Sequence, residues 1–300
     1  MPAVVDVTGS SAVRHDGFRR FAWGVLAYNV LVVLWGGYVR ASGSGAGCGS
    51  HWPLCNGVMV PPAPKIETII EFTHRVTSGL AVAAAVALCV WAFQVFPRGH
   101  RGRKTAVLGV VFLLMEALLG AGLVLFRYVA QDASAGRAWY LSAHLVNTQL
   151  LLGMLAATAW FAGPARETRT HALSWTALAV ALAAAISGAL AALGDTLYPA
   201  ASIAAGVARE FSAAAPVLLR LRLLHPIVAV AASVFLIVFA MRAGSNRYAR
   251  AVIILVFAQV GFGILNWILL APIWMQIGHL LLADLLWIAL VLLYLNYRSS

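Results

Sequence analysis

Long apolar segments alternate with short polar ones along almost the whole chain. Each apolar segment reaches or exceeds about 20 residues, the length that an α-helix needs to cross the hydrocarbon core of a bilayer. Eight such runs cover residues 21–41, 66–96, 105–127, 139–162, 172–194, 215–241, 249–270 and 273–296. Only helices or closed barrels satisfy their backbone polar groups in lipid, and these runs are too long and too uniformly apolar for barrel strands. The pattern predicts an all-α integral membrane protein with eight transmembrane helices.

Composition and charge support this fold class. Of the 300 residues, 62% are hydrophobic and 10% are charged, whereas an ordinary soluble domain carries about 25% charged residues. The net charge of +11 would be compatible with nucleic-acid binding, but the basic residues fall in short segments between the runs, where they set membrane orientation. These basic residues are Arg14, Arg19, Arg20, Arg98, Arg101, Arg103, Lys104, Arg166, Arg169, Arg242, Arg247, Arg250 and Arg298.

The intervening loops are poor in positive charge. They cover residues 42–65, 128–138, 195–214 and 271–272. We therefore expect a multi-pass protein of the cell membrane with both termini cytoplasmic and with no nucleic-acid partner. Residues 1–20 contain no apolar core, so we expect no cleavable signal peptide.

Glycine and histidine recur at matched positions in successive helix pairs. The first helix of each pair ends in a glycine-bearing stretch, and the second carries one histidine in its outer part. The glycines are Gly36, Gly37, Gly120, Gly122, Gly188, Gly261 and Gly263, and the histidines are His74, His144, His225 and His279. Gly37 and Gly188 are separated by the same interval as His74 and His225, which indicates two related halves.

The predicted domain organisation follows from this repeat. A cytoplasmic N-terminal segment, 1–20, precedes a four-helix half, 21–162. A cytoplasmic linker, 163–171, leads to a second four-helix half, 172–300.

The four histidines inside the runs are predicted to lie at similar depth, about 7–14 Å from the outer end of their helices. Two pairs of imidazoles can each hold the iron of one planar haem, and helix bundles build such sites from facing side chains. The alternatives are four separately satisfied polar residues, or a zinc site, which requires a single tetrahedral cluster. The matched depth and spacing favour one haem in each half.

Glu71 stands out because it lies three residues before His74 and therefore shares a helix face with it. Next to a haem, this carboxylate can move protons or position an oxygen-derived species. The structural alternative is an ion pair with Arg75 or Arg40. Both arginines are also candidates to bind haem propionates near the outer interface.

The second half differs in chemistry. Arg222 precedes His225, Pro226 follows it, and no acidic residue occupies the position that matches Glu71. Two further carboxylates lie within runs, Glu116 and Asp284, and each is a candidate for an interhelical hydrogen bond or for a proton route. We therefore expect one half to carry chemistry and the other to hold a cofactor or pass electrons.

The first external loop contains two of the three cysteines, Cys48 and Cys55. Their position outside the membrane permits a disulfide. This disulfide can be a structural staple or a redox-active pair, and a metal site with His51 is the weakest alternative because the nearby glycines supply no fixed frame. Cys89 lies within a predicted helix and is interpreted as a small buried residue.

At these residues the chain resembles the haem A synthase family, over nearly its whole length. Four features carry the resemblance: the Gly-x-x-Arg-x-x-Gly-Ser-Gly run at 37–45, the Cys-x6-Cys loop with Trp52-Pro53-Leu54, the Glu71-x-x-His74-Arg75 helix, and the three later histidines. The resemblance implies a membrane oxidoreductase that oxidises the C8 methyl group of haem O to a formyl group. The product, haem A, serves respiratory terminal oxidases, which places the activity in cytochrome oxidase assembly.

The resemblance also implies roles for individual residues. His74 and His144 would ligate the iron of the substrate haem, and His225 and His279 that of a haem b cofactor. Glu71 would be the catalytic carboxylate. By the same resemblance, the disulfide between Cys48 and Cys55 would take part in function, and haem O synthase and an electron donor would be partners.

Two departures from the family pattern bear on the second half. Pro226 stands where many members have an arginine, so that Arg222 becomes the candidate propionate partner of the cofactor haem. Residues 195–214 lack the second cysteine pair that some members carry.

Two other functions are compatible with parts of the pattern. A dihaem b-type cytochrome that transfers electrons from quinol without modifying haem would show the same four histidines, although it would need neither Glu71 nor the cysteine loop. A transporter would explain the repeated halves, but the helices show no matched central proline–glycine breaks.

Overall fold

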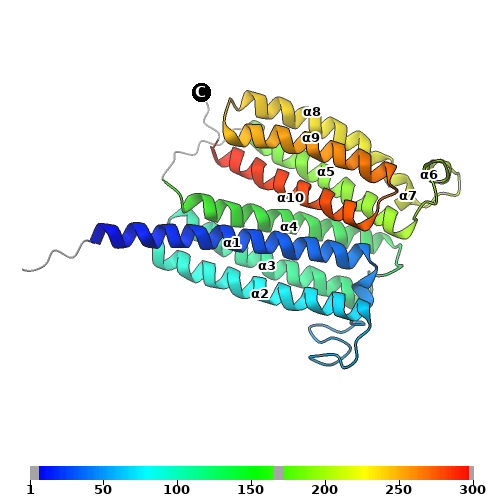
Figure 1. The fold of residues 1–300 in the computed structure, drawn as a ribbon, viewed down its shortest axis with the longest axis horizontal. Helices are drawn as coiled ribbons and strands as arrows, with labels where there is room; N and C mark the ends of the chain where they lie inside the picture. Colours follow the sequence, from blue (N-terminus) through cyan, green and yellow to red (C-terminus); the bar gives the residue numbers. More distant parts are fainter. Residues whose placement is uncertain (1–6, 165–171, 297–300) are drawn as a thin grey trace, which may run out of the picture.

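The computed structural model describes residues 7–164 and 172–296. Its long helices run side by side in one bundle (Figure 1). The elements are α1 (Val7–Ala41), the 3₁₀ helix η1 (Ser44–Ala46), α2 (Ile66–Val95), α3 (Arg101–Leu125), α4 (Ala135–Phe161), α5 (Ala172–Leu197), α6 (Ile203–Glu210), α7 (Val217–Leu221), α8 (Leu224–Arg242), α9 (Arg247–Ile268) and α10 (Ile273–Asn296). The all-helical membrane fold expected from the apolar runs is confirmed.

Helix contacts fall into two groups of four. In the first group α1 contacts α2, α2 contacts α3, α3 contacts α4, and α4 contacts α1. In the second group α5, α8, α9 and α10 follow each other in the same way. The groups meet where α4 lies against α5 and α10, and where α1 lies against α10. The origin of the two groups as a sequence repeat stays a prediction.

Seven helices of the described residues are long and apolar enough to span a membrane. They are His15–Ala41, Ile66–Val95, Arg101–Leu125, Ser174–Leu197, Val217–Arg242, Arg247–Ile268 and Ile273–Asn296. The other long helix is α4, whose buried stretch includes Asn147, Thr148 and Gln149. These polar side chains lower the mean hydropathy of α4. Their partners lie on the neighbouring helices α3 and α10. The eighth predicted span therefore stays a prediction.

At two places the helix boundaries differ from the apolar runs, although the candidate spans there, His15–Ala41 and Val217–Arg242, correspond to the predicted ones. The first helix begins at Val7, well before the apolar run at 21–41. The run at 215–241 is divided into α7 and α8, and the second of these starts at Leu224. Pro226 lies in the first turn of α8, where its missing N–H leaves no helical hydrogen bond unmade.

The helix α6 was not predicted. It lies in the connection between α5 and α7, and the Ser202 side chain caps it by accepting a hydrogen bond from the backbone N–H of Ala205. The loop that follows η1 lies at the same end of the bundle as α6 (Figure 1). Most of the predicted linker 163–171, with Arg166 and Arg169, lies outside the described residues, as does Arg298.

Alanine and leucine fill the space between the helices. Leu151, Leu152 and Leu155 of α4 are buried in a cluster that also contains Leu88 of α2 and Trp287 of α10. Small residues let helices in a membrane approach closely. Because α4 contacts both groups, it sets the position of His144, which it carries, relative to the second half.

Candidate functional site

Each of the four predicted histidines lies against a glycine of the preceding long helix. A Cβ atom on Gly36 of α1 would come within 3.0 Å of the His74 ring, and one on Gly188 of α5 within 3.0 Å of the His225 ring. The same approach is 3.3 Å for Gly263 and His279, and 4.0 Å for Gly120 and His144. Gly36, Gly188 and Gly263 therefore make room for the imidazoles that they face, whereas the contact at Gly120 is an ordinary one.

The two histidines of the second half face each other. The ring centres of His225 and His279 are 6.5 Å apart, and the rings are inclined by 80°. A metal binds an imidazole nitrogen at about 2 Å, which places the centres of two imidazoles on opposite sides of one metal about 6 Å apart. The observed separation of the ring centres is close to this value.

Neutral side chains surround this second pair. The Ser187 hydroxyl lies 2.9 Å from Nδ1 of His225, and the Gln259 side-chain amide lies 3.3 Å from Nε2 of His279. Nδ1 of His279 is buried without a hydrogen-bond partner. A buried polar atom without a partner is uncommon and is compatible with a site that binds a further group.

The first pair has a more charged environment. His74 and His144 are close enough to interact electrostatically. Nδ1 of His74 and Nδ1 of His144 are both buried without a hydrogen bond, but Nδ1 of His144 lies 3.3 Å from Oε1 of Glu116. Glu116 on α3 also accepts hydrogen bonds from Asn147, at 2.5 Å, and from Thr148, both on α4. Of the two roles considered for Glu116, the interhelical hydrogen bond is present.

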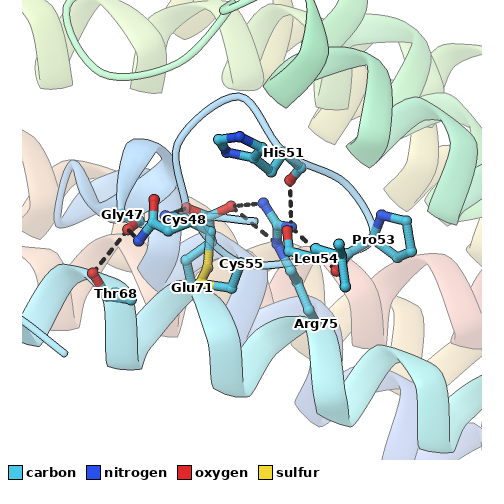
Figure 2. A network of polar contacts seen from close by, with 10 residues as sticks. Gly47, Cys48, His51, Pro53, Leu54, Cys55, Thr68, Glu71 and Arg75 are labelled. Atoms are coloured by element: carbon cyan, nitrogen blue, oxygen red, sulfur yellow. Dashed lines mark hydrogen bonds and ion pairs between the residues drawn. A yellow bond between two sulfur atoms is a disulfide. The ribbon is translucent and has the colours of Figure 1, made fainter. Parts of the chain in front are cut away.

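Glu71 is enclosed by the external loop and by Arg75 (Figure 2). Its side chain is 3% exposed, and its Oε2 accepts a hydrogen bond from the backbone N–H of Cys48 at 2.8 Å. Its Oε1 pairs with Arg75, at 3.1 Å from Nε and 2.5 Å from Nη2. The ion pair that the sequence offered as the structural alternative is therefore present. It compensates the charge of this buried carboxylate.

Arg75 extends from α2 into the loop and holds it by a second set of contacts (Figure 2). Its Nη1 donates to the backbone carbonyls of His51, at 2.7 Å, and Leu54, at 2.8 Å. One arginine thus connects the carboxylate of Glu71 to the loop that covers it. We refer to Glu71, Arg75 and the loop segment 47–55 as the loop clamp.

A disulfide closes the loop clamp between Cys48 and Cys55, and both cysteines are buried. Thr68 on α2 donates a hydrogen bond to the carbonyl of Gly47 at 2.8 Å. A Cβ atom at Gly47 would lie 2.4 Å from the backbone of Glu67, so only glycine fits this approach. Because the cysteines are bonded to each other, they offer no thiolates for the metal site considered with His51.

Arg40 lies between the two halves rather than inside one of them. Its guanidinium donates to the carbonyl of Ala192 at 3.0 Å, to the Thr196 hydroxyl at 2.9 Å and to the Gln276 side chain at 3.0 Å. These partners belong to α5 and α10, while Arg40 belongs to α1. The residue links the halves, and its assignment as a propionate partner stays a prediction.

Arg222 is paired with two carboxylates that sequence reasoning did not connect to it. Asp195 lies 3.3 Å from its Nε, and Glu210 lies 3.0 Å from its Nη2. Asp195 lies in the last turn of α5, and Glu210 is the last residue of α6. The sequence offered no signal for this cluster because both acids come from a connection without a regular pattern. The proposed propionate contact of Arg222 is untested.

Asp284 of α10 is fully buried and connects to α4. The Gln149 side chain donates a hydrogen bond to its Oδ1 at 2.9 Å, and Trp287 donates to the Gln149 carbonyl at 2.6 Å. Asp284 therefore makes the interhelical hydrogen bond that was one of its two predicted roles, here between the two halves.

Comparison with known proteins identifies the relatives of this chain. Two proteins of Thermus thermophilus named protoheme IX farnesyltransferase are 46% identical over 287 residues, which is 91% of this chain and 47% of theirs. The chain thus spans about half the length of these relatives. A heme A synthase of Halalkalibacterium halodurans is 43% identical over 97 residues, 32% of this chain and 33% of the relative. One of Bacillus mycoides is 43% identical over 103 residues, 34% of this chain and 33% of the relative.

The family assignment rests on a match that covers most of the chain. Residues 19–291 match the COX15-CtaA family, described as cytochrome oxidase assembly protein. The match includes the loop clamp and all four histidines, and it confirms the resemblance found in the sequence. The chain belongs to the COX15-CtaA family of cytochrome oxidase assembly proteins.

Proposed function

We propose that this protein is a haem A synthase that oxidises the C8 methyl group of haem O to a formyl group. The observation that carries the proposal is the loop clamp, which holds a buried carboxylate one helical turn before His74. Electron transfer alone would need no such carboxylate. The family match and the relatives named heme A synthase support the same activity.

In this proposal the first half binds the substrate. His74 and His144 hold haem O, and Gly36 provides the room for the His74 ring. Two successive hydroxylations convert the methyl group to a geminal diol, each inserting one oxygen atom into a C–H bond, and loss of water from the diol yields the formyl group. The bound haem supplies the oxidising chemistry. Glu71 serves as the catalytic carboxylate, held in place by Arg75 and by the N–H of Cys48.

The second half holds the cofactor. His225 and His279 are the proposed ligands of haem b, and their ring separation of 6.5 Å supports one iron between them. Arg40, Arg75 and Arg222 are proposed to neutralise haem propionates, in addition to the contacts described above.

The cellular setting is also proposed. We place the chain in the cell membrane with eight spans and with both termini cytoplasmic, so that the loop clamp lies on the outer side. The partners are an electron donor and haem O synthase. The relatives named protoheme IX farnesyltransferase support the second partner, because about half of their length lies beyond the part that matches this chain.

The test is expression in cells supplied with haem O, followed by mass analysis of the extracted haems. Haem A, or its alcohol precursor, is the expected product, and the variant Glu71→Gln should leave haem O unconverted. Haem b alone in the purified protein, with haem O unchanged, would instead support a dihaem cytochrome and would overturn the proposal.

A further inference from the structure

The four histidines differ in what lies beside Nδ1. A carboxylate, from Glu116, approaches His144 at 3.3 Å, and a hydroxyl, from Ser187, approaches His225 at 2.9 Å. Nδ1 of His74, of His144 and of His279 is in each case buried without a hydrogen bond, and of these three only Nδ1 of His144 has a carboxylate oxygen within ion-pair distance. Within the first pair, one histidine therefore has a charged partner behind its ring and the other has none.

Glu116 is itself held in place. Asn147 donates to its Oε2 at 2.5 Å and also to the Phe112 carbonyl at 2.8 Å, which fixes the amide between α3 and α4. Thr148 donates to Oε1, the oxygen that faces His144. Asn147 and Thr148 follow His144 by one helical turn, so the same turn of α4 carries the histidine and positions its carboxylate partner.

A carboxylate behind a metal-binding histidine has a known physical effect. It accepts the Nδ1 proton, which fixes the tautomer and leaves Nε2 free to bind, and it strengthens the imidazole as a ligand. Loss of such a partner typically weakens metal binding by about 10- to 100-fold. His74 has no such support, although its ring is held against Gly36.

We propose that Glu116 is a positioning residue that makes His144 the firmly bound iron ligand of the first half, and that His74 is the exchangeable one. The inference rests on the proposed function only in assigning both histidines to one haem. It names which ligand can leave iron when the substrate reacts.

The test uses imidazole added to variants with one histidine removed. In purified, haem-containing His144→Gly protein, free imidazole can fill the vacated space and restore the absorption and paramagnetic resonance spectra of a haem with two nitrogen ligands. Glu116 would orient this imidazole as it orients His144. The double variant His144→Gly/Glu116→Gln should therefore bind imidazole about tenfold more weakly than His144→Gly.

The matched control is the same comparison at the other ligand. Imidazole binding to His74→Gly should not change when Glu116→Gln is added, because no carboxylate lies behind His74. An equal effect in both backgrounds, or no effect in either, would overturn the proposal. Ser187→Ala should leave both first-half comparisons unchanged, because its hydroxyl lies beside His225 of the second half.

Two features keep the test decisive. Glu116→Gln retains the size of the side chain and one of the two acceptor oxygens to which Asn147 and Thr148 donate. If it does not accumulate, Thr148→Val removes one contact that holds Glu116 and should give a smaller effect of the same selectivity. The readout is imidazole binding, which does not depend on conversion of haem O. A protein that leaves haem O unconverted would overturn the proposed function, but it could still show the selective effect of Glu116.

Discussion

The two halves share a frame and differ in how charge is placed around it. In both halves a glycine on one helix makes room for a histidine on the next, and two such units form the site. In the first half two carboxylates lie near the histidines, Glu71 one turn from His74 and Glu116 beside His144. In the second half Asp195 and Glu210 pair with Arg222, Asp284 bonds to Gln149, and the histidines have the neutral neighbours Ser187 and Gln259.

If the histidine pairs hold haem as proposed, this difference separates what builds a haem site from what gives it chemistry. The glycine–histidine units require only close helix packing, which small residues supply equally well in each half. A buried carboxylate is costly in a membrane and is retained only with partners. The first half provides these partners for Glu71 through the loop clamp, and the described residues of the second half, 172–296, contain no loop closed by a disulfide. Reactivity is therefore expected in the first half alone.

Removing the charge of Glu71 should have the largest effect. Glu71→Gln should lower conversion of haem O by about 100-fold or more, the contribution typical of a positioned acid–base group. It also leaves Arg75 without its carboxylate partner. The ratio of haem O to haem A in extracts measures the effect.

A matched control for this change lies on the same helix. Glu67 is exposed in the first turn of α2, so Glu67→Gln makes the same chemical change away from the site. It should convert haem O as well as the unaltered protein does. If Glu71→Gln converted haem O as well as Glu67→Gln does, Glu71 would not be needed for the reaction, and the proposed chemical difference between the halves would be wrong.

Opening the disulfide should cost stability more than activity. The bond joins cysteines seven positions apart in the sequence, and closing such a short loop contributes about 2–3 kcal/mol. The double variant Cys48→Ser/Cys55→Ser should therefore unfold at a lower temperature in a thermal melt. Its conversion of haem O should fall less than that of Glu71→Gln, because Thr68 and Arg75 still hold the loop.

The same variant decides between a staple and a redox-active pair. If the disulfide passes electrons, conversion would cease although the protein still binds both haems. Reductant should lower the melting temperature of the unaltered protein and have no effect on the double serine variant, which makes that variant its own control.

Adding one methyl group to a glycine tests the shared frame. A Cβ atom at Gly36 would meet the His74 ring at 3.0 Å, and one at Gly188 would meet the His225 ring at the same distance. Gly36→Ala and Gly188→Ala should each cost about 1–3 kcal/mol, as overpacking does, and each should lower haem content by absorption. Gly120→Ala, with the His144 ring at 4.0 Å, should change little. Unequal losses for Gly36 and Gly188 would argue against a common frame.

The sequence was informative wherever a pattern repeats. The apolar runs predicted the long helices, and the spacing of glycines and histidines predicted the units that the structure brings together. Sequence reasoning failed at contacts that no repeat encodes. The bond from the Cys48 N–H to Glu71 involves a backbone group, which carries no signal in residue identity. The Arg222 cluster joins α5 and α6 through a connection whose path depends on tertiary packing.

The smallest expected effect concerns the start of α3 and the start of α9, at the end of the bundle away from the loop clamp. His100 caps α3 by accepting a hydrogen bond from the Gly102 N–H at Nδ1, at 3.0 Å. Asn246 caps α9 in the second half by accepting from the backbone N–H groups of Tyr248 and Ala249. Only the first of these caps contains a group that titrates near neutral pH.

This difference predicts a pH dependence confined to the first half. Burial, with the nearby charges of His15 and Arg103, lowers the pKa of His100 below its usual value. The folded protein then binds a proton less readily than the unfolded chain, so stability is complete above about pH 6.5 and declines as the pH falls below it. The decline should be about 1 kcal/mol or less, the contribution of one helix cap. Thermal melts across this pH range should show it, and His100→Asn, which copies the cap of α9, should abolish it. If the decline survived in His100→Asn, it would arise from another group, and the two helix starts would be equivalent.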